Sequence, residues 1–312
     1  MAEPKAVPVT DQDFVRGARL MRLATYASVC VAGILIVAKL IAWLATDSVA
    51  ILSSLVDSVL DSFASLLNLF AVHQALTPAD DEHRFGHGKA ESIAGLGQAA
   101  FIAGSALFLI FESIRRFVTP QDVSHGTLGI GVMTLSIVLT FGLVRFQMHV
   151  VKATGSTAIQ ADSLHYRADL LVNASIIAAL VLSTQFEVRW IDPAVAIAIA
   201  VYILYSAWQI ARGALDALMD HEFPDPERRR IIEIASAHPE VKGVHDLRTR
   251  KSGLQPFVQL HLELDGAMTL HDAHIISDQV EADIMAQFPG AEVIIHQDPE
   301  DIVEHMPDFA RE

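Results

Sequence analysis

Apolar residues fill six long stretches of the chain, and short polar segments separate these stretches. An α-helix needs about 17–25 such residues to cross a hydrocarbon core about 30 Å thick, and each stretch is long enough. The pattern therefore predicts an α-helical membrane protein with six transmembrane helices. The expected spans are Tyr26–Leu44, Val49–Ala75, Ile93–Ile114, Leu128–Val150, Ile159–Leu182 and Pro193–Ile210.

Beyond the sixth stretch the pattern changes to short elements that are typical of a small α/β domain. Two segments alternate apolar and polar residues around a turn at Ser252–Gly253, as strands do, and helical periodicity precedes and follows them. The expected order is α-β-β-α-β, which favours an open sheet with its helices on one face. The elements are Pro226–His238, Val241–Arg250, Phe257–Glu263, Leu270–Phe288 and Ala291–Gln297.

Basic residues predict the orientation of the chain in the membrane. With the amino terminus in the cytoplasm, nine Lys and Arg residues lie at cytoplasmic ends and loops, and Arg115, Arg116 and Arg189 lie opposite. We therefore expect a multi-pass protein of the cell inner (plasma) membrane, in contact with the lipid bilayer, with both termini cytoplasmic. The expected parts are an N-terminal segment at 1–20, a six-helix transmembrane domain at 21–213, a cytoplasmic domain at 214–298 and a C-terminal tail at 299–312.

Charge changes the picture of the C-terminal part. Gly213–Glu312 holds 21 acidic and 8 basic residues, so 13 of the 15 net negative charges lie there, together with 8 of the 14 histidines. An acidic surface repels nucleic acid, which is excluded as a partner, and it attracts cations. The single cysteine, Cys30, lies in the first span and allows no intramolecular disulfide; we interpret it as a packed apolar residue.

Two of the spans carry ionisable residues in matched pairs. The second span places Asp57 and Asp61 four residues apart, and the fifth places His165 and Asp169 at the same interval, so each pair shares one face of its helix. A charged side chain in lipid costs about 2.5–3.5 kcal/mol on insertion scales and usually marks an ion path. If the two faces meet, three carboxylates and one imidazole form a four-ligand site that suits tetrahedral Zn²⁺.

Each pair taken alone has another interpretation, which is a helix end that dips into the headgroup region. Asp162, close to the second pair, is interpreted as an interfacial or capping residue and not as a ligand. Lys39 lies near a span end, where snorkelling accounts for its charge. Asn68 is expected to make a polar hydrogen bond between helices.

The loop between the second and third spans offers a further group of ligands. Asp80, His83 and His87 stand at intervals of three and four, so that one carboxylate and two imidazoles can reach a single metal ion. Three protein ligands with an open position make a labile site. Solvated histidines are the alternative interpretation.

The C-terminal domain holds another group on or beside the expected strands. A carboxylate among several imidazoles indicates a binuclear metal centre, and surface histidines on an acidic domain are the alternative. His271 and His274 begin the helix that precedes the last strand. The residues of the group are His245, His261, His296 and Asp298.

These residues together resemble the cation diffusion facilitator family, close to its bacterial zinc and ferrous-iron efflux members. The resemblance rests on the D-x-x-x-D and H-x-x-x-D pairs, on F-G-H-G-K-A-E-S in the loop, and on H-D-L-R-T-R and H-Q-D-P in the tail. It implies a metallochaperone-like cytoplasmic domain, a homodimer and metal/proton antiport. It also implies an ion pair between Lys89 and Asp220 that links the membrane part to the tail at the dimer interface.

The resemblance further assigns the ligands to three sites. It leaves His271 without a counterpart, and it associates the Asp-Asp/His-Asp set with zinc and cadmium. Zn²⁺ is the expected metal, both as the transported ion and as a structural ion. Cd²⁺ and Fe²⁺ are the alternative metals. The sites are Asp57, Asp61, His165 and Asp169 for transport, Asp80, His83 and His87 in the loop, and His245, His261, His274, His296 and Asp298 in the cytoplasmic binuclear centre.

The expected function is efflux of a divalent cation, zinc first, from the cytoplasm by proton antiport. The alternatives are a divalent cation channel and an exporter selective for Fe²⁺, Cd²⁺ or Mn²⁺. A membrane metalloenzyme would need an open metal position and a separate general base, which the sequence does not obviously supply, so no enzymatic activity is expected. No phosphate loop of the G-x-x-x-x-G-K type occurs in the chain.

Overall fold

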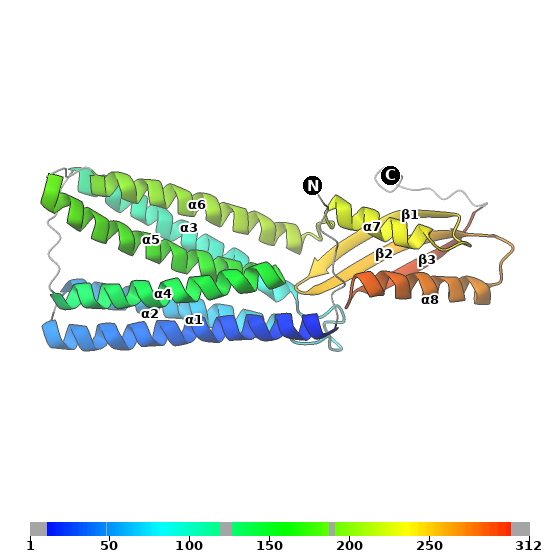
Figure 1. Cartoon of the computed structure of the whole chain (residues 1–312), viewed down its shortest axis with the longest axis horizontal. Helices are drawn as coiled ribbons and strands as arrows, with labels where there is room; N and C mark the ends of the chain where they lie inside the picture. Colours follow the sequence, from blue (N-terminus) through cyan, green and yellow to red (C-terminus); the bar gives the residue numbers. More distant parts are fainter. Residues whose placement is uncertain (1–10, 48, 119–126, 187–190, 301–312) are drawn as a thin grey trace.

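The computed structural model describes residues 11–47, 49–118, 127–186 and 191–300. In this part six long helices form an elongated bundle, and an α/β domain follows at one end of it (Figure 1). Residues 1–10 of the expected N-terminal segment and 301–312 of the expected tail lie outside the described residues. The helices of the bundle are α1 (Asp11–Thr46), α2 (Val49–Ala75), α3 (Lys89–Val118), α4 (Thr127–Thr154), α5 (Thr157–Phe186) and α6 (Ile191–Leu218).

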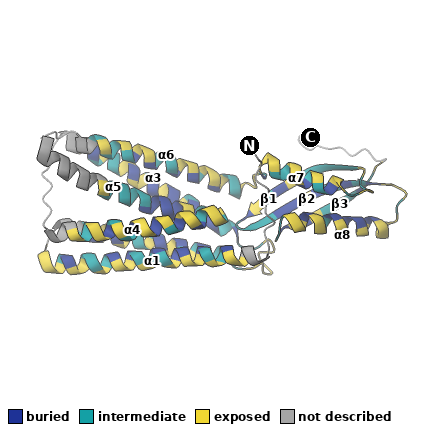
Figure 2. Cartoon of the chain, viewed as in Figure 1, coloured by how far each residue is buried: buried dark blue, intermediate teal, exposed yellow. Residues whose placement is uncertain are grey.

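The bundle is apolar on its outside as well as its inside. Small side chains such as Ala99, Ala161 and Ala207 are buried where α3, α5 and α6 meet, which lets the helix backbones approach closely. Many residues on the outside of the bundle are exposed (Figure 2). Large apolar residues are among them, such as Phe70 and Phe108. A soluble monomer rarely exposes so many such residues together, so the outer surface is suited to lipid.

Five of the six helices have the length and apolar composition needed to cross a membrane, within the residues that the structure describes. The exception is α5, which carries Asp162, Arg167 and Asp169 in its first half. This helix packs against α3, α4 and α6. The predicted helical membrane domain is confirmed, and the half of α5 that carries these charges is largely buried among its neighbours.

The C-terminal domain is a three-stranded sheet with two helices on one face. The strands lie in the order β1-β2-β3, with β1 and β2 antiparallel and β2 and β3 parallel. Alternate residues of β2 from Val258 to Leu264 are buried against Ile231 and Ile284 of the two helices. This confirms the predicted order. The elements are α7 (Asp225–Ser236), β1 (Gly243–Ser252), β2 (Gln255–Leu264), α8 (Leu270–Gln287) and β3 (Glu292–Pro299).

The two parts of the chain meet where the segment before α3 touches the β1–β2 hairpin. Gly88 lies so close to the backbone of Ser252 that a Cβ at position 88 would overlap the Ser252 carbonyl group. Beside this contact, the Arg250 guanidinium lies over the rings of Phe85 and Phe257, 4.8 and 4.7 Å from their centroids. The close approach and the ring stack together fix the hairpin against the start of α3.

We expect Gly88→Ala to separate the hairpin from the start of α3. Overlap of this kind costs about 1–3 kcal/mol, so the midpoint of thermal unfolding in detergent should fall. Gly97→Ala is the matched control, because nothing lies within 4 Å of a Cβ at that position of α3. Equal midpoints for the two variants would contradict the tight contact at Gly88.

Candidate metal centres

Three of the four expected transport ligands meet between α2 and α5. Asp61, His165 and Asp169 offer ligand atoms that all lie within 4.8 Å of one another. His165 Nε2 lies 3.1 Å from Asp61 Oδ1 and 3.9 Å from Asp169 Oδ2. This nitrogen is buried and makes no hydrogen bond of good geometry to a described residue. A nitrogen that faces two carboxylates in this way suits a shared cation.

Two other polar residues of α2, Asp57 and Asn68, do not make the contacts that the sequence predicts for them within the described part of the chain. Asp57 lies outside the group; its side chain is exposed, although it interacts electrostatically with Asp61 and Asp169. Its role as the fourth ligand stays a prediction. The amide of Asn68 is fully buried, and neither of its polar atoms has a hydrogen-bond partner among the described residues. The prediction that Asn68 makes an interhelical hydrogen bond is therefore wrong.

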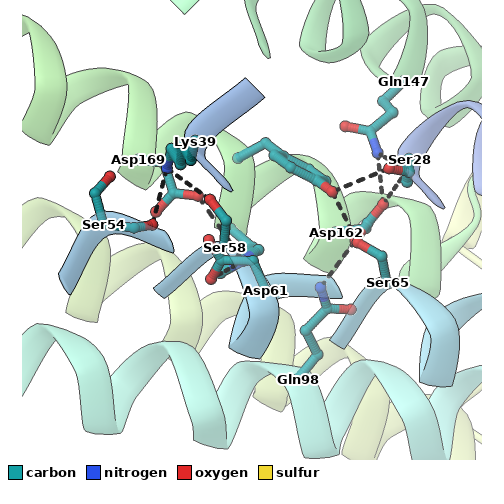
Figure 3. A network of polar contacts seen from close by, with 12 residues as sticks. Ser28, Lys39, Ser54, Ser58, Asp61, Ser65, Gln98, Gln147, Asp162 and Asp169 are labelled. Atoms are coloured by element: carbon teal, nitrogen blue, oxygen red, sulfur yellow. Dashed lines mark hydrogen bonds and ion pairs between the residues drawn. The ribbon is translucent and has the colours of Figure 1, made fainter. Parts of the chain in front are cut away.

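A second buried carboxylate, Asp162, lies one turn before His165 and ties four helices together (Figure 3). Asp162 is completely buried and accepts hydrogen bonds from one side chain of each of three other helices. The donors are Ser28 of α1 at 2.5 Å, Gln147 of α4 at 2.6 Å and Gln98 of α3 at 3.2 Å. These donors satisfy the buried carboxylate. The interpretation of Asp162 as an interfacial or capping residue is wrong, because it is the centre of a network inside the bundle.

Tyr166 extends this network to α2. Its hydroxyl lies 2.8 Å from Ser65 Oγ and donates to the backbone oxygen of Ser28 at 3.3 Å. The residue directly after His165 is therefore anchored to α1 and α2, and Asp162 anchors the preceding turn. Anchored neighbours of this kind fix the direction of a ligand side chain.

The loop ligands also come together, at the end of the bundle that meets the C-terminal domain (Figure 1). Asp80 lies 3.3 Å from His83 Nδ1 through its Oδ1 and 3.4 Å from His87 Nε2 through its Oδ2. The His83 backbone N–H donates to Asp80 at 2.6 Å, and this hydrogen bond lowers the pKa of the Asp80 carboxyl. The carboxylate is thus ionised and held in a turn, ready to share a metal ion with the two imidazoles.

Three histidines of the C-terminal domain lie side by side across the sheet. His245 of β1 is in register with His261 of β2, which is in register with His296 of β3. Each imidazole contacts the buried carboxylate of Asp298. The distances to Asp298 are 3.2 Å from His245 Nε2, 2.7 Å from His261 Nδ1 and 3.1 Å from His296 Nε2. The Asp298 carboxylate therefore lies where it can share bound metal ions with all three imidazoles.

Two carboxylates that the sequence did not single out border this cluster. Glu263 lies 3.0 Å from His245 Nδ1, and Asp246 lies 3.7 Å from His261 Nε2. Glu263 follows His261 by two residues and so shares its strand face, which is a signal present in the sequence. Asp246 reaches the cluster from an irregular part of β1, where its φ is +44°. Carboxylates at such positions orient imidazole ligands.

The donor set of the C-terminal cluster fits a divalent transition metal. Ligand atoms of His245, His261 and Asp298 all lie within 4.8 Å of one another. Both ring nitrogens of His245 are buried without a hydrogen bond of good geometry among the described residues. His274 is not brought to this cluster within one chain; it is exposed on α8, 3.5 Å from Asp278. Its assignment to the binuclear site stays a prediction.

Comparison with known proteins identifies the family from both parts of the chain. Residues 25–219 match the cation efflux transmembrane domain, and residues 223–300 match the cytoplasmic domain of cation efflux proteins. The chain belongs to the cation efflux family. The resemblance drawn from the intramembrane pairs and the loop and tail strings is thereby confirmed, and cation efflux is the class of transport that the family performs.

Relatives in the cation efflux family cover nearly the whole chain. The cation-efflux pumps FieF of Yersinia pestis strain Pestoides F and of Yersinia pseudotuberculosis serotype O:3 are each 48% identical over 286 residues, which is 92% of this chain and 95% of the relative. A solved structure of CzrB in its zinc form is 31% identical and covers 28% of this chain and 99% of its own, with a TM-score of 0.25. The metal-bound C-terminal domain of the CzcD transporter from Thermotoga maritima is 28% identical and covers 25% of this chain and 93% of its own, with a TM-score of 0.25.

An ion pair links the membrane part of this cation efflux protein to its tail. Lys89 Nζ lies 2.9 Å from Asp220 Oδ1 within one chain, which confirms the expected pair. Partial burial raises the pKa of the Asp220 carboxyl, but the hydrogen bond from Lys89 and the charges of Lys89 and Arg250 outweigh burial, so the pKa is lower than its ordinary 3.8. The pair joins the start of α3 to the end of α6.

The Lys89–Asp220 pair gives a stability difference that depends on pH. A carboxyl whose pKa is lowered by folding stabilises the protein fully above its ordinary pKa of 3.8 and loses this effect as the pH falls through the folded value. The thermal midpoint of Asp220→Asn should therefore lie below that of wild type near neutral pH, and the difference should shrink below about pH 4. Asp225→Asn, at an exposed position, is the control. A difference that persists unchanged in acid would contradict the assignment.

Proposed function

We propose that this cation efflux protein exports a divalent transition metal, zinc first, from the cytoplasm in exchange for protons. The observation that carries the proposal is the convergence of Asp61, His165 and Asp169 from two helices of the bundle. With Asp57 one turn before Asp61, the set offers three carboxylates and one imidazole. The metal ion at this site is the transported substrate.

Exchange for protons follows from the chemistry of the ligands. A carboxylate or an imidazole must lose its proton before it binds a metal ion, so metal and protons compete for Asp61, His165 and Asp169. When such a site opens alternately to the two sides of a membrane, the more acidic side favours release of the metal. A proton gradient across the plasma membrane then drives export without ATP.

The ligand types support zinc over harder ions. An imidazole with carboxylates accommodates Zn²⁺, and Cd²⁺ and Fe²⁺ bind similar sets, whereas Mn²⁺ prefers oxygen ligands. A channel would need weak binding along an open axis. Three ligands gathered around one point favour a transporter that binds and releases its substrate.

The other two clusters complete the proposal as structural zinc sites of a homodimer with both termini in the cytoplasm. Asp80, His83 and His87 would hold one ion, and the group around Asp298 would hold a pair. Bound cations would neutralise an acidic surface that otherwise repels a second copy of the chain. The proposed cytoplasmic metal-binding domain runs over 214–298, after a transmembrane domain at 21–213.

The proposal predicts that the pH gradient sets the direction of zinc movement in sealed vesicles that contain the purified protein. Reversing an imposed gradient should reverse net zinc flux, and adding zinc should drive protons the opposite way. Alanine at any transport ligand removes both charge and geometry and should reduce the flux to background. The variants are Asp57→Ala, Asp61→Ala, His165→Ala and Asp169→Ala.

The Asp283→Ala variant, at an exposed position of α8, is the control and should keep wild-type flux. Zinc flux that ignores the gradient would rule out antiport, and an ohmic current would indicate a channel. If Fe²⁺, Cd²⁺ or Mn²⁺ moves faster than zinc, that ion is the preferred substrate in place of zinc. Near-normal flux in one alanine variant would remove that residue from the site.

His165→Asp should change the order of preference among metals. Carboxylate replaces imidazole, so Mn²⁺ should gain on Zn²⁺ by about tenfold or more in relative initial rate. The measurement is the flux of each metal under one fixed pH gradient. An unchanged ranking in an active variant would show that the imidazole does not select the metal.

A further inference from the structure

Lys39 of α1 is held against α2 beside the transport site. Its Nζ donates to Ser58 Oγ at 2.6 Å and to the backbone oxygen of Ser54 at 3.1 Å. Ser58 is buried and directly follows Asp57 in the chain. The ammonium group is thus anchored between two helices, and the expectation that Lys39 snorkels to the membrane surface is wrong.

The charge of Lys39 acts on the transport carboxylates. The ammonium interacts electrostatically with Asp61, Asp169 and Asp57. Figure 3 shows the Lys39 side chain ending beside Ser58, in the same group of contacts as Asp61 and Asp169. Its hydrogen bonds go to the serine hydroxyl and a backbone oxygen, which leaves the carboxylate oxygens available to a metal ion.

The positive charge of Lys39 changes the net charge of the transport site. The three carboxylates of the proposed site carry three negative charges, a metal-ligating histidine is neutral, and Lys39 adds one positive charge. Counted over these five groups, a divalent cation then brings the loaded site to zero net charge. A monovalent cation leaves it negative, and a trivalent cation leaves it positive. Because net charge inside a membrane is costly, the divalent ion gives the least costly loaded state.

We propose that Lys39 is a specificity-determining residue, a fixed counter-charge that matches the transport site to divalent cations and keeps their binding reversible. This inference rests on the proposed function, because it concerns the same site. An anchored ammonium repels every cation in the site, and it repels a trivalent ion more strongly than a divalent one. Without Lys39, three carboxylates hold a divalent ion more tightly and release it more slowly.

The test measures initial rates of zinc flux through the full-length protein in proteoliposomes at about pH 8, where protons compete least. Lys39→Gln should lower the KM for zinc at least about tenfold and also lower the maximal rate, because release from a tighter site is slower. Lys39→Arg keeps the charge and should keep a KM close to wild type. Lys152→Gln removes a positive charge from the exposed end of α4 and should change neither parameter.

A second readout separates a charge effect from a loss of packing. Block of zinc flux by La³⁺ should require at least about tenfold less La³⁺ in Lys39→Gln than in wild type, because the trivalent ion gains most from removal of the ammonium. A purely structural role would lower the maximal rate without shifting the La³⁺ block. An unchanged or higher KM for zinc in Lys39→Gln would overturn the inference.

The outcomes also distinguish this inference from the proposed function. Wild-type protein that moves no divalent metal would sink the proposed function itself, whereas active wild type with an unshifted Lys39→Gln sinks only the role of Lys39. If Lys39→Gln does not accumulate, Lys39→Met, which is also uncharged and unbranched, takes its place. Failure of both to fold beside a stable Lys39→Arg would assign the charge to folding and overturn the inference.

Discussion

The cost of burying carboxylates among lipid-facing helices governs the arrangement of the membrane domain. The bundle meets this cost in two different ways. Asp162 is satisfied permanently, by three neutral donors from three other helices. Asp61 of α2 and Asp169, about two turns beyond Asp162 on α5, face an imidazole whose buried nitrogen has no well-formed hydrogen bond among the described residues. The first group can therefore stay fixed, whereas the second is the group that we propose binds an exchangeable cation.

The C-terminal domain meets a different constraint, because its charges lie near water and repel each other. Its sheet places three imidazoles in one row and sets the buried Asp298 carboxylate against all of them. The face that carries the row lies opposite the helices, since alternate residues of β2 are packed against α7 and α8. Because side chains of a strand alternate between faces, the same register that buries Leu260 and Leu262 exposes His261 to its partners.

Much of this organisation could be predicted from the sequence, because apolar periodicity and i, i+4 spacing are properties of single helices. The spans, the order of the tail elements and the placement of His165 and Asp169 on one helix face follow from such local patterns. That Asp61 meets them is a contact between helices, which the predicted four-ligand site assumed. The partners of Asp162 could not be predicted, since contacts between helices depend on how each helix is rotated in the bundle. The direction of Lys39 depends on the same rotation. Glu263 was visible in principle, two residues beyond His261 on one strand face.

The connection between α2 and α3 contains both candidate metal ligands and a contact between the two parts of the chain. It carries Asp80, His83 and His87, and it ends in Gly88, which packs against the hairpin of the tail. Surface loops ordinarily tolerate insertions and deletions. Here an added or deleted residue would displace either the ligands or the junction, so natural variants of this chain should conserve the length of this connection even where its sequence drifts. It acts as a spacer of fixed length.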